Sequence, residues 1–119
     1  MNVQTNLYTR LVQAATGKLR AELDAVNGQL HNIDRAERIA RRLRDIELDA
    51  SAEAGPGAVP FIVLRLPIEL LQLQGNVIAL VRNTLERKLV QNGRDSQGRD
   101  CFQILDDERA SLALVVEPI

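Results

Sequence analysis

The most continuous hydrophobic pattern in the chain covers residues 59–90. Its first part, PFIVLRL at 60–66, is apolar after the proline except for Arg65. Because this run is short, β-branched and aromatic, and has no alternating polar positions, it predicts a central strand covered on both faces. From Pro67, a residue suited to the first turn of a helix, apolar side chains recur at helical spacing as far as Leu89. This spacing predicts one long helix after the strand.

A second helical pattern occupies residues 6–48. Its first part has apolar residues three and four positions apart, and from residue 19 onward the spacing is heptad-like, although such a short pattern is more typical of an ordinary helix hairpin than of a true coiled coil. The register slips at 31–34, where Asp34 and Glu37 resemble a capping box. We therefore place a second helix from Arg35 to residue 48, with a single long bent helix as the alternative. The heptad-like positions, which are candidates for self-association, are Leu19, Leu23, Val26 and Leu30.

The remaining segments carry turn and strand patterns. Residues 50–58, ASAEAGPGA, contain small residues around Gly-Pro-Gly and predict a mobile surface loop. Residues 91–100, QNGRDSQGRD, have the composition of turns. Residues 101–105 and 111–116 predict two short strands, which would form a hairpin around the acidic turn at 106–109.

These patterns together predict an α+β fold in a single domain, residues 1–119. We expect a helical front half at 1–49, a mobile linker at 50–58, and a β-α-β-β unit at 59–119. The front half would be a helical hairpin or one long bent helix. The second unit would be a small three-stranded sheet packed on a long helix. A chain of 119 residues can bury a core without a metal or a crosslink.

Composition narrows the possible partners. The chain is 45% hydrophobic and 26% charged, with a formal net charge of −1. This balance argues against a general electrostatic attraction to nucleic acid or to a membrane surface. No apolar run approaches the length needed to cross a bilayer, and the first residues do not resemble a signal peptide. We therefore expect a cytoplasmic protein with no membrane association.

The residues that usually carry chemistry are sparse. The chain has one cysteine, Cys101, so no internal disulfide can form, and one histidine, His31. We expect a half-buried structural thiol and a local hydrogen-bonding imidazole, because no further metal ligands lie near the histidine in sequence. The acidic residues 106–108 lack the spacing of a calcium loop. Catalytic, nucleotide-binding and zinc patterns are absent, so we expect no catalytic residue, no metal and no cofactor.

Arginine is the dominant basic residue, with 13 copies against two lysines. The helix expected from residue 35 places several arginines on its outer face, where they could contact phosphates or an acidic partner. Acidic residues four positions away, as in the Asp34–Arg38 spacing, favour a solvated, salt-bridged face instead. The arginines of this candidate face are Arg35, Arg38, Arg41 and Arg42.

Two more candidate contacts lie in the turn segment. Arg94 and Arg99 each belong to a Gly-Arg-Asp triplet. Exposed arginines in a loop could contact a partner. The aspartate beside each arginine favours a turn that satisfies its own charges.

The surplus of apolar surface gives the leading functional hypothesis. A three-stranded sheet would leave the second face of its central strand uncovered, and the heptad-like stripe would also lack a partner. Self-association would cover both, and a two-fold dimer is the commonest form. We therefore expect a non-enzymatic interaction or assembly module that acts as a homo-oligomer and binds another, unidentified protein. The alternatives are a nucleic-acid-binding accessory protein that uses the arginine helix, and a small-ligand binder or enzyme with a site between subunits.

Overall fold

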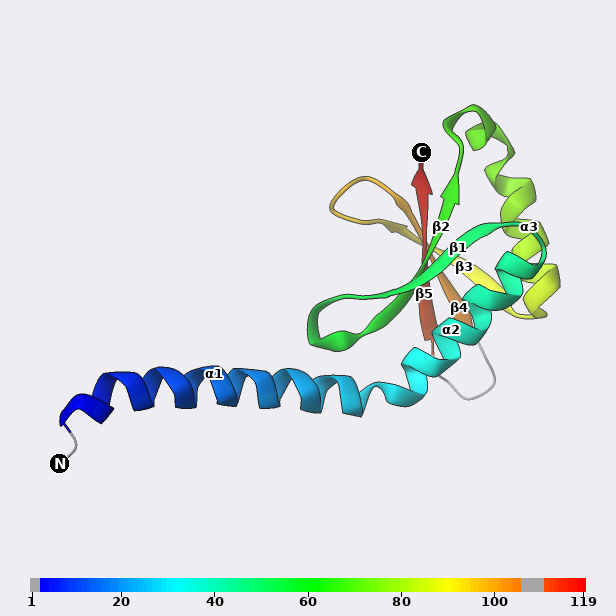
Figure 1. The fold of residues 1–119 in the computed structure, drawn as a ribbon. Coiled ribbons are helices and arrows are strands. Elements are labelled where there is room, and N and C mark those ends of the chain that lie inside the picture. Colours follow the sequence, from blue (N-terminus) through cyan, green and yellow to red (C-terminus); the bar gives the residue numbers. More distant parts are fainter. Residues whose placement is uncertain (1–2, 106–110) are drawn as a thin grey trace.

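The computed structural model of this protein describes residues 3–105 and 111–119 and shows an α+β fold, as the sequence predicts (Figure 1). Two helices come first, and a mixed sheet with a further helix follows. In chain order the elements are α1 (Val3–Gly28), α2 (Leu30–Asp45), β1 (Asp49–Ala54), the short 3-10 helix η1 (Pro56–Ala58), β2 (Pro60–Leu66), the 3-10 helix η2 (Ile68–Leu73), α3 (Gln74–Leu85), β3 (Lys88–Arg94), β4 (Asp100–Leu105) and β5 (Ser111–Pro118).

The described strands form one five-stranded sheet in the order β1-β2-β5-β4-β3. Strand β2 pairs in parallel with β5, and the other neighbouring strands are antiparallel. The expected strand at 60–66 is confirmed, and β2 does lie between two neighbours. The expected strands at 101–105 and 111–116 are confirmed as β4 and β5, although each is longer than predicted. The acidic turn expected at 106–109 lies outside the described residues.

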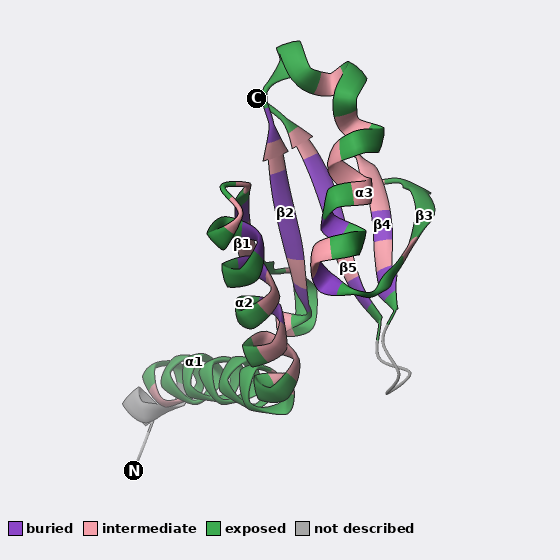
Figure 2. Ribbon diagram, turned by 90° about the vertical axis from the view of Figure 1, so that its right-hand side faces the viewer, coloured by how far each residue is buried: buried purple, intermediate pink, exposed green. Residues whose placement is uncertain are grey.

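The core lies between one face of the sheet and helices α2 and α3 (Figure 2). Alternate residues of β2, β4 and β5 face the helices, because successive side chains of a strand point to opposite faces. From α2, Ala36, Ala40 and Leu43 are completely buried. The two alanines allow the helix to approach the sheet closely, and Leu43 fills the space between the helix and the sheet. From α3, Val81 and Leu85 complete this layer.

The sheet has two strands that the sequence did not predict, and both lie at its edges. Residues 50–58, expected to be a mobile linker, form most of β1 and all of η1 instead. The small residues are suited to this place because α2 packs directly over β1, where Ala50 is buried. Strand β1 takes its backbone hydrogen bonds from β2, a neighbour that local composition does not reveal. The predicted three-stranded sheet is therefore too small.

The long helix expected to reach Leu89 is also shorter than predicted. Residues 68–73 form η2, and α3 ends at Leu85, where the capping residue Glu86 adopts a left-handed conformation with φ 54°. The chain then enters β3, where Leu89 pairs with Ile104 of β4. An apolar residue every few positions fits a helix and a half-buried strand equally well over so short a distance. Pairing with β4 decides the outcome.

The front half is one bent helical segment, and the predicted helical hairpin does not form. Helix α2 begins at Leu30, five residues before the expected start, and only Gln29 separates it from α1. Asp34 is therefore not a cap and lies inside α2, where it pairs with Arg38 at 3.0 Å. The bend follows Gly28, a residue with low helix propensity. The alternative expectation, a single long bent helix, is closer to the observed arrangement.

Helix α1 projects away from the rest of the molecule (Figure 1). The described structure measures 69 × 32 × 25 Å, and its radius of gyration is 19.2 Å. A compact domain of this length would have a radius of roughly 13–14 Å. The difference arises from α1, which contacts the body mainly at η1 and at the joint with α2.

The packing of α2 predicts a stability change. Replacing Leu43 with alanine removes a completely buried side chain and should lower the free energy of unfolding by about 2–5 kcal/mol. Chemical denaturation followed by circular dichroism measures this change. In the control variant Leu80→Ala, which trims a side chain of α3 that is 45% exposed, the loss should be below about 1 kcal/mol. Equal losses in the two variants would contradict the burial assigned to α2.

Candidate functional site

The most distinctive surface of the protein is an apolar row that runs along α1 to the first residue of α2, and we call it the α1 stripe. It consists of Val12, Leu19, Leu23, Val26 and Leu30. All five side chains are exposed, with exposed fractions from 40% at Val26 to 56% at Leu19 and Leu30. In Figure 2, α1 is exposed along nearly its whole length, in contrast with the buried strands. The four residues predicted for self-association are therefore accessible on one projecting helix and its junction with α2.

Further apolar side chains are exposed near the beginning of α1. Leu7, Tyr8 and Leu11 have exposed fractions of 60% or more. Monomeric soluble proteins rarely expose large contiguous apolar patches, and such patches commonly mark interaction sites. The exposed apolar surface of α1 thus extends beyond the predicted residues. The sequence signal for this part was the same helical spacing, which continues toward the N-terminus of the helix.

The tip of the β1–β2 hairpin meets α1 at a groove that Val26 of the stripe also lines, and Leu19 and Leu23 lie outside this groove. Gly55, Gly57 and Ala58 of this tip face Ala21 and Ala25 of α1 across a shallow groove of about 480 Å³. Ala21 and Ala25 are each two positions from Leu23, and at 100° per residue they lie roughly 160° around the helix from it. The hairpin therefore supports α1 from the side opposite Leu23. Small residues on both sides explain the close approach.

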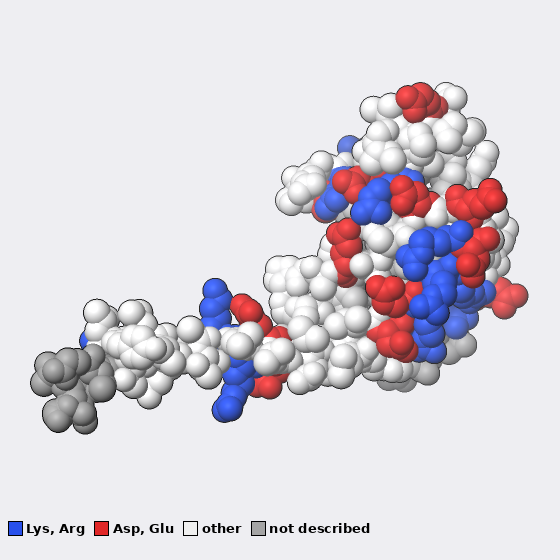
Figure 3. Space-filling model, viewed as in Figure 1, with Lys and Arg blue, Asp and Glu red and all other residues white. Residues whose placement is uncertain are grey.

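The arginines predicted on α2 have contacts within the chain. Arg38 pairs with Asp34 at 3.0 Å, and Arg42 donates a hydrogen bond from Nη2 to the carbonyl oxygen of Thr84 in α3 at 2.6 Å. Arg35 is half-buried, and Arg41 is exposed. Figure 3 shows acidic and basic side chains interleaved over the surface that includes α2. Two arginines of this face are therefore held by contacts within the chain, and the face carries charges of both signs.

The turn segment also satisfies its own charges. Arg99 Nε lies 2.7 Å from Asp95 Oδ2, and Arg94 Nε lies 3.1 Å from Asp100 Oδ1. The backbone N–H groups of Gln97 and Arg99 both donate to Asp95 Oδ1 at 2.9 Å. These bonds, first among them the one from the Arg99 backbone, lower the pKa of Asp95. Both predicted arginine contacts are therefore engaged in closing the β3–β4 hairpin.

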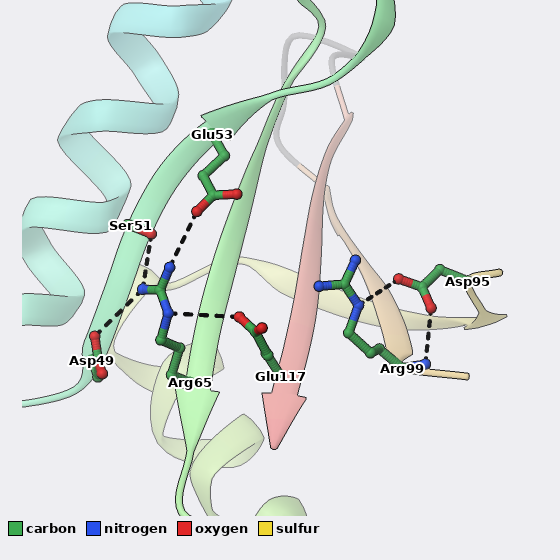
Figure 4. A network of polar contacts seen from close by, with 7 residues as sticks. All are labelled: Asp49, Ser51, Glu53, Arg65, Asp95, Arg99 and Glu117. Carbon is green, nitrogen blue, oxygen red and sulfur yellow. Dashed lines mark hydrogen bonds and ion pairs between the residues drawn. The ribbon is translucent and has the colours of Figure 1, made fainter. Parts of the chain in front are cut away.

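A polar cluster on the sheet was not predicted. Arg65 of β2 lies 3.1 Å from Glu53, 3.5 Å from Asp49 and 3.6 Å from Glu117, so one guanidinium joins strands β1, β2 and β5 (Figure 4). It also donates a hydrogen bond to Ser51 Oγ at 3.0 Å. The only signal in the sequence was a lone charge within an apolar run. Since its acidic partners are on strands distant in sequence or unpredicted, the cluster could not be assembled from the sequence.

The cysteine and the histidine do not form a reactive site in this structure. Cys101 is half-buried, and its Sγ donates to the carbonyl oxygen of Arg99 at 3.5 Å. Burial raises the pKa of the thiol, and the nearby charge of Asp95 raises it further. A raised pKa disfavours the nucleophilic thiolate. His31 lies exposed on α2, and the described residues contain no group of three or more metal-ligating side chains.

The lowered pKa of Asp95 predicts a pH dependence. Its carboxylate stabilises the folded state above its unfolded pKa of about 3.9, and this contribution is lost as the pH falls through the lower folded pKa. Asp95→Asn should therefore lose less stability than the wild type between about pH 6 and pH 2. Denaturation at a series of pH values measures the difference. A wild-type profile in Asp95→Asn would contradict the assignment.

Comparisons with known proteins suggest no function for this chain, so a function has to be inferred from the surfaces described above. No family model, curated protein or solved structure matches this chain. Within the described ranges, every helix is too short or too polar to cross a membrane. The exposed apolar surface of α1 is thus the feature that most needs a functional explanation.

Proposed function

We propose that this protein is a non-enzymatic interaction module that assembles with copies of itself through the α1 stripe. The observation that carries this proposal is the exposure of Leu19, Leu23 and Val26 on the projecting helix α1, together with that of Leu30 at its junction with α2. The remaining body supplies a stable platform that directs this helix outward. Assembled copies would present several sheet domains to another protein.

The intrinsic weakness of α1 supports a partner. Helices in proteins derive most of their stability from the packing of an apolar face and less from the intrinsic propensity of their residues. Gly17 lies in the interior of α1 and costs about 1 kcal/mol relative to alanine. Glu22 and the neighbouring alanines meet the hairpin tip, but the part of α1 before Lys18 lies beyond this contact. A second helix along the stripe would supply the missing packing.

The amount of apolar surface is sufficient for association. Complete burial of a leucine or valine side chain contributes about 1.5–3 kcal/mol, so covering the exposed half of one contributes about 1 kcal/mol. The five residues of the α1 stripe on each of two chains would then contribute about 10 kcal/mol. Association costs about 4–15 kcal/mol in lost freedom. For a two-helix assembly, the dimer expected from the sequence, the gain from burial is therefore close to the cost of association. Any further buried surface would favour the dimer.

The other functional hypotheses gain less support. Arg38 and Arg42 are held by Asp34 and by the Thr84 carbonyl, so fewer guanidinium groups can turn toward phosphates. The thiol of Cys101 has a raised pKa, which is unfavourable for nucleophilic catalysis. We therefore favour assembly over nucleic-acid binding and over an enzyme site between subunits.

A double substitution tests the proposed interface. Leu19→Asp combined with Leu23→Asp places charges in the middle of the stripe, and burial of unpaired charges is strongly unfavourable. We expect the wild type to be an oligomer at low and at high salt, because an apolar interface is not screened by ions. The double variant should be a monomer. Light scattering after size exclusion measures both masses.

A matched control uses the polar side of the same helix. Gln13→Glu adds a charge at an exposed position of α1 away from the stripe and should leave the mass unchanged. Circular dichroism and the unfolding transition check that the sheet domain stays folded in each variant. A wild-type protein that is monomeric at micromolar concentration, or a double variant with the wild-type mass, would refute the proposal.

A further inference from the structure

We propose that two copies of this chain associate through antiparallel α1 helices, so that the beginning of each α1 lies beside the joint between α1 and α2 of its partner. This inference rests on the proposed function, since it assigns the direction of the second helix on the same surface. Two observations carry it. The first is the order of the charges on the two sides of the stripe, and the second is the projection of α1 beyond its own body.

The first observation concerns four charged residues in the middle of α1. Two basic residues come first along the helix and two acidic residues follow: Lys18, Arg20, Glu22 and Asp24. All four are exposed, and no ion pair joins any of them to another residue of the described ranges. At 100° per residue, Lys18 and Glu22 lie on one side of the stripe. Arg20 and Asp24 lie on the other side, so each side carries one charge of each sign (Figure 3).

The direction of the partner helix decides whether these charges meet. In a coiled coil, the e and g positions beside the a and d stripe carry the ion pairs that set orientation. With Leu23 at a, Arg20 occupies e and Glu22 occupies g. Parallel helices bring a g position of one chain to an e position in the next heptad of the other. Glu22 would then meet Asn27, and Arg20 would meet Ala15, so neither charge would be paired.

Antiparallel helices bring each side of the stripe to the same side of the partner, where opposite charges meet. With a two-fold axis that crosses the helices near Ala21, Arg20 lies about 3 Å along the helix from the level of Asp24 of the partner subunit, at about 1.5 Å per residue. By the same symmetry, Lys18 lies equally near the level of Glu22 of the partner subunit. Each pair occurs twice, so all four charged residues of both chains can be paired.

The same register keeps the apolar stripes together. It sets Leu19 level with Leu23 of the partner subunit, and Val26 level with Thr16 of the partner subunit. Helix α1 contacts its own body mainly at η1 and at the joint with α2, so its first turns project past that body (Figure 1). In the antiparallel pair these turns run beside the joint of the partner. A parallel pair would place both bodies at the same end and leave the first turns without this contact.

Cysteine crosslinking in the full chain tests the orientation. Cys101→Ser removes the native thiol, and Thr16→Cys and Val26→Cys are added to this background singly and together. Across the antiparallel pair these two positions are level, but each lies about 15 Å along the helix from its own copy. A disulfide needs Cα atoms within about 7 Å of each other. We therefore expect crosslinked dimers on a non-reducing gel only when both cysteines are present.

Light scattering of the reduced protein separates the outcomes. Crosslinking of the double variant alone, together with a dimer mass, supports the antiparallel pair. Crosslinking of either single variant, a dimer whose double variant stays uncrosslinked, or a mass of three or more chains would overturn this inference and leave the proposed function standing. A monomer at every concentration would overturn both.

A charge exchange provides the second test. Lys18→Glu with Arg20→Glu makes the middle of α1 wholly acidic and should weaken association about tenfold at low salt, because several individually weak ion pairs are lost together. Adding Glu22→Lys and Asp24→Lys restores opposite charges across the antiparallel pair and should return the wild-type affinity. Sedimentation equilibrium measures the affinities, and circular dichroism checks that each variant is folded. An acidic variant as tight as the wild type, or a full exchange that stays weak, would refute the argument from charge.

Discussion

The packing of α2 against β1 and β2 is the interaction on which the rest of the structure depends. Ala36 and Ala40 allow the helix to approach the sheet closely, and the side chain of Leu43 is completely buried between the helix and the sheet. Because only Gln29 connects α2 to α1, the position of α2 on the sheet also sets the direction in which α1 projects. The same packing covers β1 and so helps to hold the hairpin tip that supports α1. Helix α2 therefore both packs in the core and determines the position of the candidate interface on α1.

Several arginines are paired within the chain, whereas the apolar side chains of α1 are exposed. Arg65, Arg94 and Arg99 meet carboxylates of the same chain, and Arg42 reaches a backbone carbonyl. Such contacts lock strands and turns together, and they leave these guanidinium groups less available to a partner. The apolar side chains of α1 have no comparable cover among the described residues. This asymmetry is the physical basis for proposing association through α1.

The candidate site could be predicted in part from the sequence. The spacing of Leu19 and Leu23 identified a helix face, because apolar periodicity is a local property of the chain. A turn that satisfies its own charges was also predicted, although each arginine pairs with the aspartate of the other triplet, Arg99 with Asp95 and Arg94 with Asp100. The Arg65 cluster was not accessible, because it requires Glu53 and two other acidic residues brought together by strand pairing.

The sequence by itself determined the α+β class, the helical front half and the strands β2, β4 and β5. Each of these elements has an apolar pattern of its own. Only the tertiary structure decided that 49–54 is a strand, that α3 gives way to β3 before Leu89, and that α1 and α2 meet at a bend without folding back on each other. Edge strands of small or polar residues obtain their hydrogen bonds from a neighbour. Their conformation therefore depends on contacts between residues far apart in the chain, which local patterns do not specify.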